Sequence, residues 1–489
     1  IEVEDIDMSQ DFTSRNEKTD PPHAITKVPT GIVGLDEVLQ GGIPEGGLTL
    51  LSGGPGSGKT MLGLAFLVRS AQAGRPGILL TFEERKRDLR NYAFGFGWDL
   101  PLLEKRQSLA IISARMPPNA LLSGDFDLRG LLGIVQQQAQ QMEARHILID
   151  APDVFLRLLE NTVKERAELQ ALYEWLRNAN LTCILTAKRQ GKSVFASYYE
   201  FLDYMAECVI HLNQDVSEQI ATRRLRIIKY RGSTYGRNEY PFAITSEGLR
   251  IIPVTQTSLE HQALGESLPS GIEGMDEILG GGFRRNSCTL ITGGSGTGKT
   301  TFACSFALAA TSSGERVIYL DFEESWEALL SCMQSVGLDL RQAFDSGKLR
   351  FFSSMPESKG VEEHLIQAFR AVEDCEPQHL VVDAISACRR MGSEHAAFDY
   401  LLRLIDFCKK RGITTLLTNL TASDAGSGQE ITGLDLSSVI DTVIILSNVQ
   451  DQKRFKRKLR VFKSRGRGHS NRIHEFKIKE QGIRICPGE

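Results

Sequence analysis

The chain has 489 residues, a formal net charge of −4 and an ordinary globular composition, 41% hydrophobic and 24% charged. This length is enough for two large domains, each with its own core. No run of about 18 apolar residues is present, so we expect no membrane span. The scattered, unpaired cysteines favour a cytoplasmic protein. The acidic balance argues against a dedicated nucleic-acid-binding protein. Nine cysteines without a C-x-x-C pair favour reduced, buried thiols.

Residues 1–20 are polar and acidic and lack the apolar segment of a signal peptide, so they predict a flexible N-terminal arm. After the arm we expect a first domain over residues 21–253. A polar linker without strong periodicity follows over residues 254–268, and a second domain over residues 269–489.

Short apolar segments at corresponding places in the two halves predict strands. In the first half they are residues 48–52, 77–82, 146–150 and 182–186, and in the second half 289–292, 317–322, 379–383 and 414–418. Helices are expected from Lys59 and Lys299 onward and over residues 164–179, where the periodicity is helical. Residues 223–230 and 458–463 predict antiparallel edge strands. The alternation of strands and helices indicates an α/β fold, with a mainly parallel sheet flanked by helices in each domain.

One phosphate-binding motif, G-x-x-x-x-G-K-[ST], occurs twice at an offset of 240 residues. The copies are Gly53-Gly54-Pro55-Gly56-Ser57-Gly58-Lys59-Thr60 and Gly293-Gly294-Ser295-Gly296-Thr297-Gly298-Lys299-Thr300. In this motif the backbone N–H groups surround phosphates, the lysine reaches the β- and γ-phosphate oxygens, and the last hydroxyl holds Mg²⁺. The sequence therefore predicts two ATP sites, with Thr60 and Thr300 as Mg²⁺ ligands.

The duplication extends beyond the loops. Residues 81–84 (T-F-E-E) correspond to residues 321–324 (D-F-E-E) at the same offset of 240. Residues 147–150 correspond to residues 380–383 at an offset of 233, and each segment ends in an aspartate, Asp150 or Asp383. A carboxylate at the end of such a strand is placed to orient Mg²⁺ across from the loop hydroxyl. The alternative role for each aspartate is a helix N-cap.

The acidic pairs Glu83-Glu84 and Glu323-Glu324 follow the strand after each P-loop helix. Because side chains alternate across a strand, we expect one of each pair to face the γ-phosphate and polarise the attacking group. We choose Glu83 and Glu323 as the catalytic bases, with Glu84 and Glu324 as the second candidates. Glu323 is also included among the expected Mg²⁺ ligands. The alternative for either copy alone is a solvated acidic turn.

A K-x-R-G sequence also occurs twice, at an offset of 234 residues. Its copies begin Lys229-Tyr230-Arg231 and Lys463-Ser464-Arg465. The two cations of each copy lie two apart on a strand and therefore project from one face, where they can neutralise charge on a γ-phosphate, in their own subunit or across a subunit boundary. An ordinary exposed basic strand is the alternative reading.

Two further segments are ambiguous from the residues alone. Ser437-Ser438 precedes the apolar strand expected over residues 442–446, and adjacent hydroxyls in such a place usually cap a helix or face solvent. The basic cluster over residues 453–460 contains one Phe and no aromatic ladder, so it indicates a hairpin tip rather than a nucleic-acid site.

Together these residues resemble the KaiC family, the double-domain RecA-like ATPases of the cyanobacterial circadian clock and their bacterial relatives. The resemblance covers about residues 26–485. Besides the repeated motifs, it rests on three segments of the first repeat: residues 97–100 (G-W-D-L), 124–128 (G-D-F-D-L) and 240–245 (Y-P-F-A-I-T).

The resemblance implies a homo-hexameric ring with ATP and Mg²⁺ at the subunit interfaces. The first repeat would hydrolyse ATP slowly, with Glu83 as base. The second would be a serine/threonine autokinase and autophosphatase acting on Ser437 and Ser438, with Glu323 as base. The two K-x-R segments match residues supplied by the neighbouring subunit, and Arg223 and Arg457 match positions that line the nucleotide site.

Three features depart from the family pattern. Ala151 and Ala384 follow the metal-site aspartates where the clock protein has Ser, and Val336 stands where its second repeat has a Trp near the base. The chain ends at Glu489, without the tail that recruits the activator KaiA, so KaiA is not an expected partner. A KaiB-like protein on the first repeat is compatible with the sequence.

Two other functions fit the P-loops. One is a RecA-like, DNA-dependent motor, which the acidic balance and the lack of an aromatic stacking platform disfavour. The other is a scaffold assembled by ATP in which the kinase activity is vestigial.

Overall fold

The computed structural model describes residues 25–115, 128–153, 162–188, 196–217, 220–246, 248–253, 261–421, 436–451 and 454–486. The expected N-terminal arm, the first half of the expected linker and family-motif residues 124–127 lie outside these ranges. Within them, no helix is long and apolar enough to cross a membrane.

Each half of the chain contains a nine-stranded sheet. In spatial order, the first sheet consists of β5 (Leu109–Ser113), β4 (Gly77–Thr81), β6 (His146–Asp150), β7 (Thr182–Lys188), β3 (Leu48–Gly53), β8 (Cys208–Ser217), β9 (Ile220–Tyr230), β10 (Glu239–Thr245) and β11 (Gly248–Ile251). The strands from β5 to β8 are parallel, and β9, β10 and β11 continue the sheet antiparallel.

The second sheet repeats this order and these directions. It consists of β16 (Leu349–Ser353), β15 (Val317–Asp321), β17 (His379–Asp383), β18 (Thr414–Leu420), β14 (Cys288–Gly293), β19 (Thr442–Asp451), β20 (Arg454–Ser464), β21 (His474–Lys479) and β22 (Gly482–Ile485). The predicted fold class, two tandem RecA-like domains with mainly parallel sheets, is therefore confirmed.

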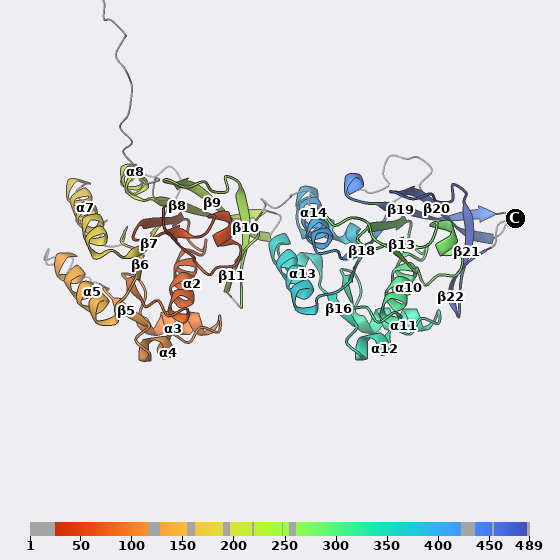
Figure 1. Cartoon of the computed structure of the whole chain (residues 1–489), viewed down its shortest axis with the longest axis horizontal. Coiled ribbons are helices and arrows are strands. Elements are labelled where there is room, and N and C mark those ends of the chain that lie inside the picture. Colours follow the sequence, from red (N-terminus) through yellow and green to blue (C-terminus); the bar gives the residue numbers. More distant parts are fainter. Residues whose placement is uncertain are drawn as a thin grey trace, which may run out of the picture.

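Helices cover both faces of each sheet (Figure 1). In the first half they are α1 (Leu35–Val38), α2 (Lys59–Gln72), α3 (Lys86–Phe94), α4 (Leu100–Lys105), α5 (Leu128–Met142), α7 (Thr162–Ala179) and α8 (Ala196–Met205). In the second half they are α9 (Met275–Ile278), α10 (Lys299–Ser312), α11 (Trp326–Gln334), α12 (Arg341–Asp345), α13 (Val361–Cys375) and α14 (Glu394–Lys410), with 3₁₀ turns η2 (Pro356–Ser358), η3 (Ile385–Met391) and η4 (Leu436–Ser438). Two short antiparallel strand pairs complete the domains, β1 (Lys27–Val28) with β2 (Ile43–Pro44) and β12 (Ser267–Leu268) with β13 (Phe283–Arg284).

The alternation of side chains along the central strands builds two cores per domain. In β3, Leu51 packs in the cluster that contains α2, α3 and α4, whereas Leu48 and Leu50 pack in the cluster that contains α5 and α7. β3 and β6 are buried along their whole length because helices cover both faces of the sheet. A strand covered on both faces needs apolar side chains on both faces. The short uninterrupted apolar runs of the sequence are these strands.

One sequence prediction about the sheet edge is wrong. The strands expected over residues 223–230 and 458–463 are antiparallel, as predicted, but they do not form the edges. β9 lies between β8 and β10, and β20 lies between β19 and β21. The edges beyond them are β11 and β22, which the terminal hairpins of each repeat supply.

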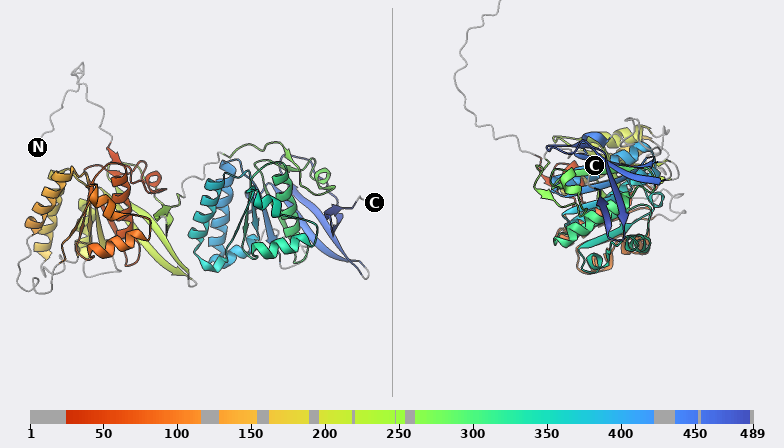
Figure 2. Two further views of the ribbon diagram at one scale, coloured as in Figure 1. Left: turned by 90° about the horizontal axis from the view of Figure 1, so that it is seen from below. Right: turned by 90° about the vertical axis from the view of Figure 1, so that its right-hand side faces the viewer.

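The two domains lie side by side along the long axis of the molecule (Figures 1 and 2). Helix α13 of the second domain faces β10 and β11 of the first, and Ala243 and Ile252 pack in the core cluster that contains α13 and α14. Arg250 Nη2 lies 2.8 Å from both carboxylate oxygens of Glu373 across this boundary. In the second half of the expected linker, His261 Nε2 lies 2.9 Å from Asp406 Oδ1, so this part packs on the second domain.

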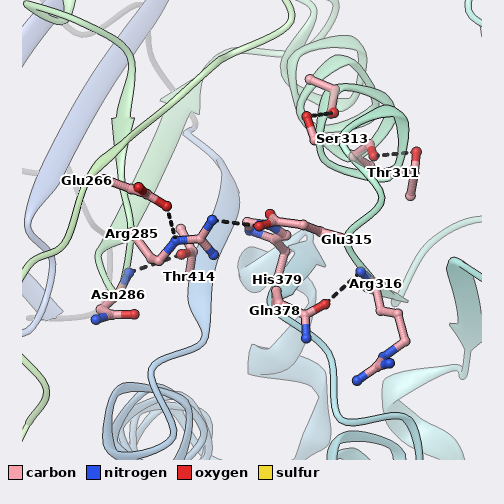
Figure 3. A network of polar contacts seen from close by, with 12 residues as sticks. Glu266, Arg285, Asn286, Thr311, Ser313, Glu315, Arg316, Gln378, His379 and Thr414 are labelled. Carbon is pink, nitrogen blue, oxygen red and sulfur yellow. Dashed lines mark hydrogen bonds and ion pairs between the residues drawn. The ribbon is translucent and has the colours of Figure 1, made fainter.

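A polar network closes the amino-terminal ends of the second domain's strands (Figure 3). Arg285 Nη2 lies 2.6 Å from Glu315 Oε1, and the ring of buried His379 bonds the other oxygen of Glu315. The residues at the Arg285 and Glu315 positions of the first repeat, 240 residues earlier, are Glu45 and Arg75, with the charges exchanged. This network lies at the end of the sheet opposite the P-loops.

Candidate functional site

Each P-loop joins a buried strand to a long helix. β3 runs into the first loop and α2 begins at Lys59, while β14 and α10 flank the second loop. The N-cap residues Gly58 and Gly298 have φ of 96° and 102°, a left-handed conformation that favours glycine. The loops therefore present backbone N–H groups at the positive end of a helix dipole, which is an arrangement that binds phosphate.

The P-loop lysines fold back over their own loops. Lys59 Nζ donates to the carbonyls of Gly53 at 2.9 Å and Gly54 at 2.7 Å, and Lys299 Nζ donates to Gly294 at 2.8 Å. Burial lowers the pKa of both lysines, partly offset by the aspartates Asp150 and Asp383. A phosphate group at the loop would stabilise the charged lysine and replace these carbonyl contacts.

The two aspartates at strand ends lie beside their loops, at equivalent places. Asp150 Oδ2 accepts a 2.9 Å hydrogen bond from Thr60, and its other oxygen accepts from Thr186. Asp383 accepts from Tyr319 at 2.8 Å and from Thr418. Burial is the main cause that raises the pKa of Asp150, and the two hydroxyl bonds oppose it.

Carboxylate and hydroxyl oxygens at this position fit Mg²⁺. Bound there, the ion would neutralise charge on the β- and γ-phosphates. Thr60 with Asp150, and Thr300 with Asp383, are the residues placed to hold it. Thr300, Asp383 and Glu323 line one cavity of the second site.

The acidic pairs lie beyond the ends of their strands. β4 ends at Thr81 and β15 at Asp321, so the strand alternation on which we separated the members of each pair does not apply. Glu323 and Glu324 both line the second cavity. Burial raises the pKa of Glu84 and Glu324, and neighbouring carboxylates add to this effect.

The second site is a cavity of about 540 Å³ that is built by one domain. It is lined by loop, helix and strand residues that include Lys299, Glu323, Val336 and Arg457. Arg457 Nε is buried there without a hydrogen-bond partner among the described residues, so the cavity presents an unused donor. This donor, the loop N–H groups and the buried lysine together fit an anionic nucleotide such as ATP. In the first domain, Arg223 Nε lies 3.5 Å from the carbonyl oxygen of Gly56.

The K-x-R cations lie at the opposite end of the sheet from the loop of their own domain. Tyr230 pairs with Cys208, which is level with Thr49 near the start of β3, whereas the loop begins at Gly53. At about 3.3 Å per residue, the stretch from Thr49 to Gly53 spans roughly 13 Å. The side chain of Tyr230 is buried and donates to the carbonyl of Gly42 at 2.9 Å.

Backbone carbonyls hold these cations at that end. Lys229 Nζ donates to the carbonyl of Asp203 at 2.6 Å, and Arg231 Nη2 donates to that of Tyr204 at 2.5 Å. In the second domain, Lys463 Nζ donates to the carbonyl of Ile440 at 2.8 Å. Arg465 lies beside Asp441, with 3.7 Å between Nη1 and Oδ1.

Ser437 and Ser438 form the end of η4, before β19 begins at Thr442. Thr442 pairs with Ser464, so the two serines lie at the same end of the sheet as Lys463 and away from their own P-loop. Ser438 is exposed. The side chain of Ser437 lies outside the described part of the chain.

Three residues near the sites were missed from the sequence. Lys188, at the end of β7, forms an ion pair with Glu83. Tyr319 lies beneath Asp383, and Asp321 accepts the backbone N–H groups of Glu323 at 2.8 Å and Glu324 at 2.7 Å. Burial raises the pKa of Asp321 to about 7. The only sequence signal was the mismatch between repeats, since Leu79 and Thr81 stand 240 residues before Tyr319 and Asp321.

Known proteins match this chain over both repeats. The family model described as "ATPase: KaiC" matches residues 28–256 and again residues 268–489. "Circadian clock protein KaiC2" of Synechocystis sp. is 36% identical over 463 residues, which cover 94% of this chain and 81% of that protein. "Circadian clock oscillator protein KaiC" of Parathermosynechococcus lividus is 34% identical, over 94% of this chain and 85% of that protein. "Circadian clock protein KaiC3" of Synechocystis sp. is 32% identical, over 94% and 92%. The chain belongs to the KaiC family of ATPases.

Proposed function

We propose that this KaiC-family ATPase works as a hexameric ring with two different ATP sites. The first domain hydrolyses ATP slowly. The second domain is a serine autokinase and autophosphatase that modifies Ser437 and Ser438. The observation that carries the proposal is the placement of these serines and of the K-x-R cations, which lie at the end of the sheet opposite their own P-loop.

That placement makes each site of a single chain incomplete. The P-loop, the metal-site aspartate and the glutamate pair lie at one end of the sheet, whereas Lys463, Arg465 and the acceptor serines lie at the other. A closed ring of identical subunits joined head to tail brings these opposite ends together at every interface. The cations of one subunit then neutralise γ-phosphate charge on the next, which is the role of an arginine finger.

Transfer in the second domain follows from this arrangement. A serine oxygen of one subunit attacks the γ-phosphorus of ATP bound to the next subunit, and the serine proton passes to Glu323. The bond between the γ-phosphorus and the β–γ bridging oxygen breaks, and ADP leaves. In the phosphatase step, a water oxygen attacks the phosphorus, the bond between the serine oxygen and the phosphorus breaks, inorganic phosphate leaves, and a proton returns to the serine oxygen. In the first domain, Glu83 orients water instead of a serine.

Mixed chains test both the kinase activity and its direction across the interface. A Lys299→Ala chain keeps its acceptor serines but loses the loop lysine of the second site. A Ser437→Ala/Ser438→Ala chain keeps the site but has no acceptor. With labelled ATP, each variant alone should stay unlabelled, and the mixture should carry label on the Lys299→Ala chain at residues 437–438.

Other outcomes of this experiment would contradict parts of the proposal. Labelling of the wild type with none in the mixture would contradict transfer between subunits. A wild type that hydrolyses ATP but never carries phosphate would support an ATP-assembled scaffold instead of a kinase. Size measurement with and without ATP checks the ring itself.

The relatives are named circadian clock proteins, and we extend that role to this chain as circadian-type or signalling regulation. In this role, a KaiB-like protein would bind the first domain with an affinity that depends on the phosphorylation of Ser437 and Ser438. Phosphate-dependent binding of such a protein, measured with wild type and with the Ser437→Ala/Ser438→Ala chain, tests this extension. Equal binding to both chains would contradict it.

A further inference from the structure

Lys188 lies at the carboxyl-terminal end of β7, directly beside the first P-loop. In the parallel register of β3 and β7 it is level with Gly53, the first residue of the loop. Its ammonium group forms an ion pair with Glu83 Oε1 and remains partly exposed. Its positive charge is also close enough to Lys59 to contribute, after burial, to the lowered pKa of that lysine.

Among the described residues of the second domain, the position equivalent to Lys188 carries no charge. Leu420 holds the corresponding position, level with Gly293 at the end of β18, and it lines the cavity of the second site. Within the described ranges, Glu323 makes no ion pair, in contrast to Glu83. The two sites therefore differ by one cation at the strand end next to the phosphate loop.

The surroundings of Lys188 suit an anion. Two lysines approach the same loop, Lys59 held by backbone carbonyls and Lys188 by a carboxylate. Phosphate oxygens at the loop would relieve the repulsion between these lysines. Lysine is a flexible point charge on a four-carbon stem, so its ammonium group can exchange one anionic partner for another without moving the strand.

We propose that Lys188 binds the γ-phosphate of ATP in the first site from within the same subunit, and that it releases Glu83 when it does so. This inference rests on the proposal that the first domain hydrolyses ATP. It makes Lys188 a γ-phosphate-specific contact, because ADP lacks the group that draws the lysine away from Glu83. Glu83 is then free to orient the attacking water only when ATP is bound.

Equilibrium binding of ATP and of ADP tests this role. The full chain carries Lys299→Ala to silence the second loop, and Lys188 is replaced by leucine, the residue of the second site. We expect Lys188→Leu to weaken ATP binding on the order of tenfold to a hundredfold, the usual weight of a hydrogen bond to a charged group, and to leave ADP binding unchanged. Lys188→Arg should retain the preference for ATP. The reciprocal variant, Leu420→Lys in a Lys59→Ala chain, should raise the preference of the second site for ATP over ADP.

Unchanged ADP binding also shows that the variant is folded. If Lys188→Leu weakens the binding of ATP and of ADP equally, or changes the binding of neither, the inference is wrong and Lys188 only restrains Glu83. ATP turnover of the Lys299→Ala chain is measured alongside. Suppose that this chain does not hydrolyse ATP but that Lys188→Leu still weakens ATP binding relative to ADP binding. This result would contradict the assignment of hydrolysis to the first domain but would support the contact between Lys188 and the γ-phosphate.

Discussion

The hydroxyl of Tyr319 donates a 2.8 Å hydrogen bond to Oδ2 of Asp383, whereas the matching oxygen of Asp150 accepts a 2.9 Å bond from the P-loop hydroxyl of Thr60. A buried tyrosine in the second domain thus takes the place that the loop threonine holds in the first. Leu79, at the Tyr319 position of the first repeat, cannot make this contact. Asp150 and Asp383 are therefore held from different directions, although they occupy corresponding positions in the two repeats.

Tyr319→Phe should destabilise the second domain because it leaves a buried carboxylate oxygen without its donor. We expect a loss of about 1–3 kcal/mol in the free energy of unfolding, measured by chemical denaturation. Tyr92→Phe, at a tyrosine that is 50% exposed, is the control and should change little. Equal stability of the Tyr319→Phe chain and the wild type would show that the hydrogen bond between Tyr319 and Asp383 does not stabilise the fold.

Arg231→Ala should abolish most ATP hydrolysis in the first domain without removing ATP binding, because the residue lies away from its own loop and, in the proposed ring, contacts the ATP site of the neighbouring subunit. Loss of such a cation costs on the order of 10³-fold or more in turnover. A Lys59→Ala chain is also inactive in its first site but keeps Arg231. Mixing the two chains should restore activity at interfaces that combine an intact loop with an intact arginine. Both chains carry Lys299→Ala, so that the second site does not contribute.

Failure of the mixture to recover any turnover, with rings of normal size, would contradict a role between subunits. Arg231→Lys is the conservative control and should retain part of the activity. Recovery by Arg231→Ala alone at high ATP concentration would mean that the residue assists binding instead of turnover.

The sequence was sufficient for the fold and for the loop side of both sites. Local glycine geometry, buried apolar runs and the repeated offset predict the loops, Asp150 and Asp383. The sequence was not sufficient to place residues whose position relative to the loops depends on strand register. Lys188 and Leu420 look unrelated in sequence, and only the register with Gly53 and Gly293 makes them equivalent. The strand alternation used for Glu83 and Glu84 failed because β4 ends two residues before Glu83.

The buried ion pair between Lys409 and Asp441 anchors the segment that follows Ser437 and Ser438. Lys409 Nζ lies 2.7 Å from Asp441 Oδ2, the two side chains are 9% and 7% exposed, and the same oxygen accepts the N–H of Cys288 at 2.9 Å. Lys409→Ala leaves the buried carboxylate with only the half-exposed Arg465, 3.7 Å away, and we therefore expect a loss of about 3 kcal/mol in the free energy of unfolding, the lower end for a broken buried pair.

An exposed pair provides the matched control for Lys409→Ala. Arg484 and Glu273 are 3.0 Å apart, with side chains 62% and 65% exposed. Glu273→Ala should cost at most about 1 kcal/mol, because water and salt screen such a pair. Similar losses for the two variants, in the same denaturation assay, would mean that burial does not set the strength of the Lys409–Asp441 pair.

His146 makes the stability of the first domain depend on pH. Burial is the main cause that lowers its pKa from 6.5 to about 4, and the positive charges of Arg75 and Arg145 add to this effect. Because the folded pKa lies below the unfolded one, the unfolded chain takes up a proton first as the pH falls. His146 should therefore contribute a decrease of roughly 3 kcal/mol in the free energy of unfolding between about pH 6.5 and about pH 4, at about 1.4 kcal/mol per pKa unit, whereas the raised pKa values of Asp150 and Glu84 act in the opposite direction as the pH falls.

His146→Gln should remove this slope, because glutamine does not titrate. His395→Gln is the control, since it makes the same substitution at a histidine whose side chain is 83% exposed. Denaturation of the wild type and both variants at several pH values across this window separates the three cases. The carboxylate of Glu315 does not interfere with this measurement. Burial alone would raise the pKa of Glu315, but hydrogen bonds from His379 and Arg285 lower it below 4.5. The stabilising effect of Glu315 is therefore lost only at more acidic pH. An identical pH dependence of the wild type and of His146→Gln would contradict the contribution of His146.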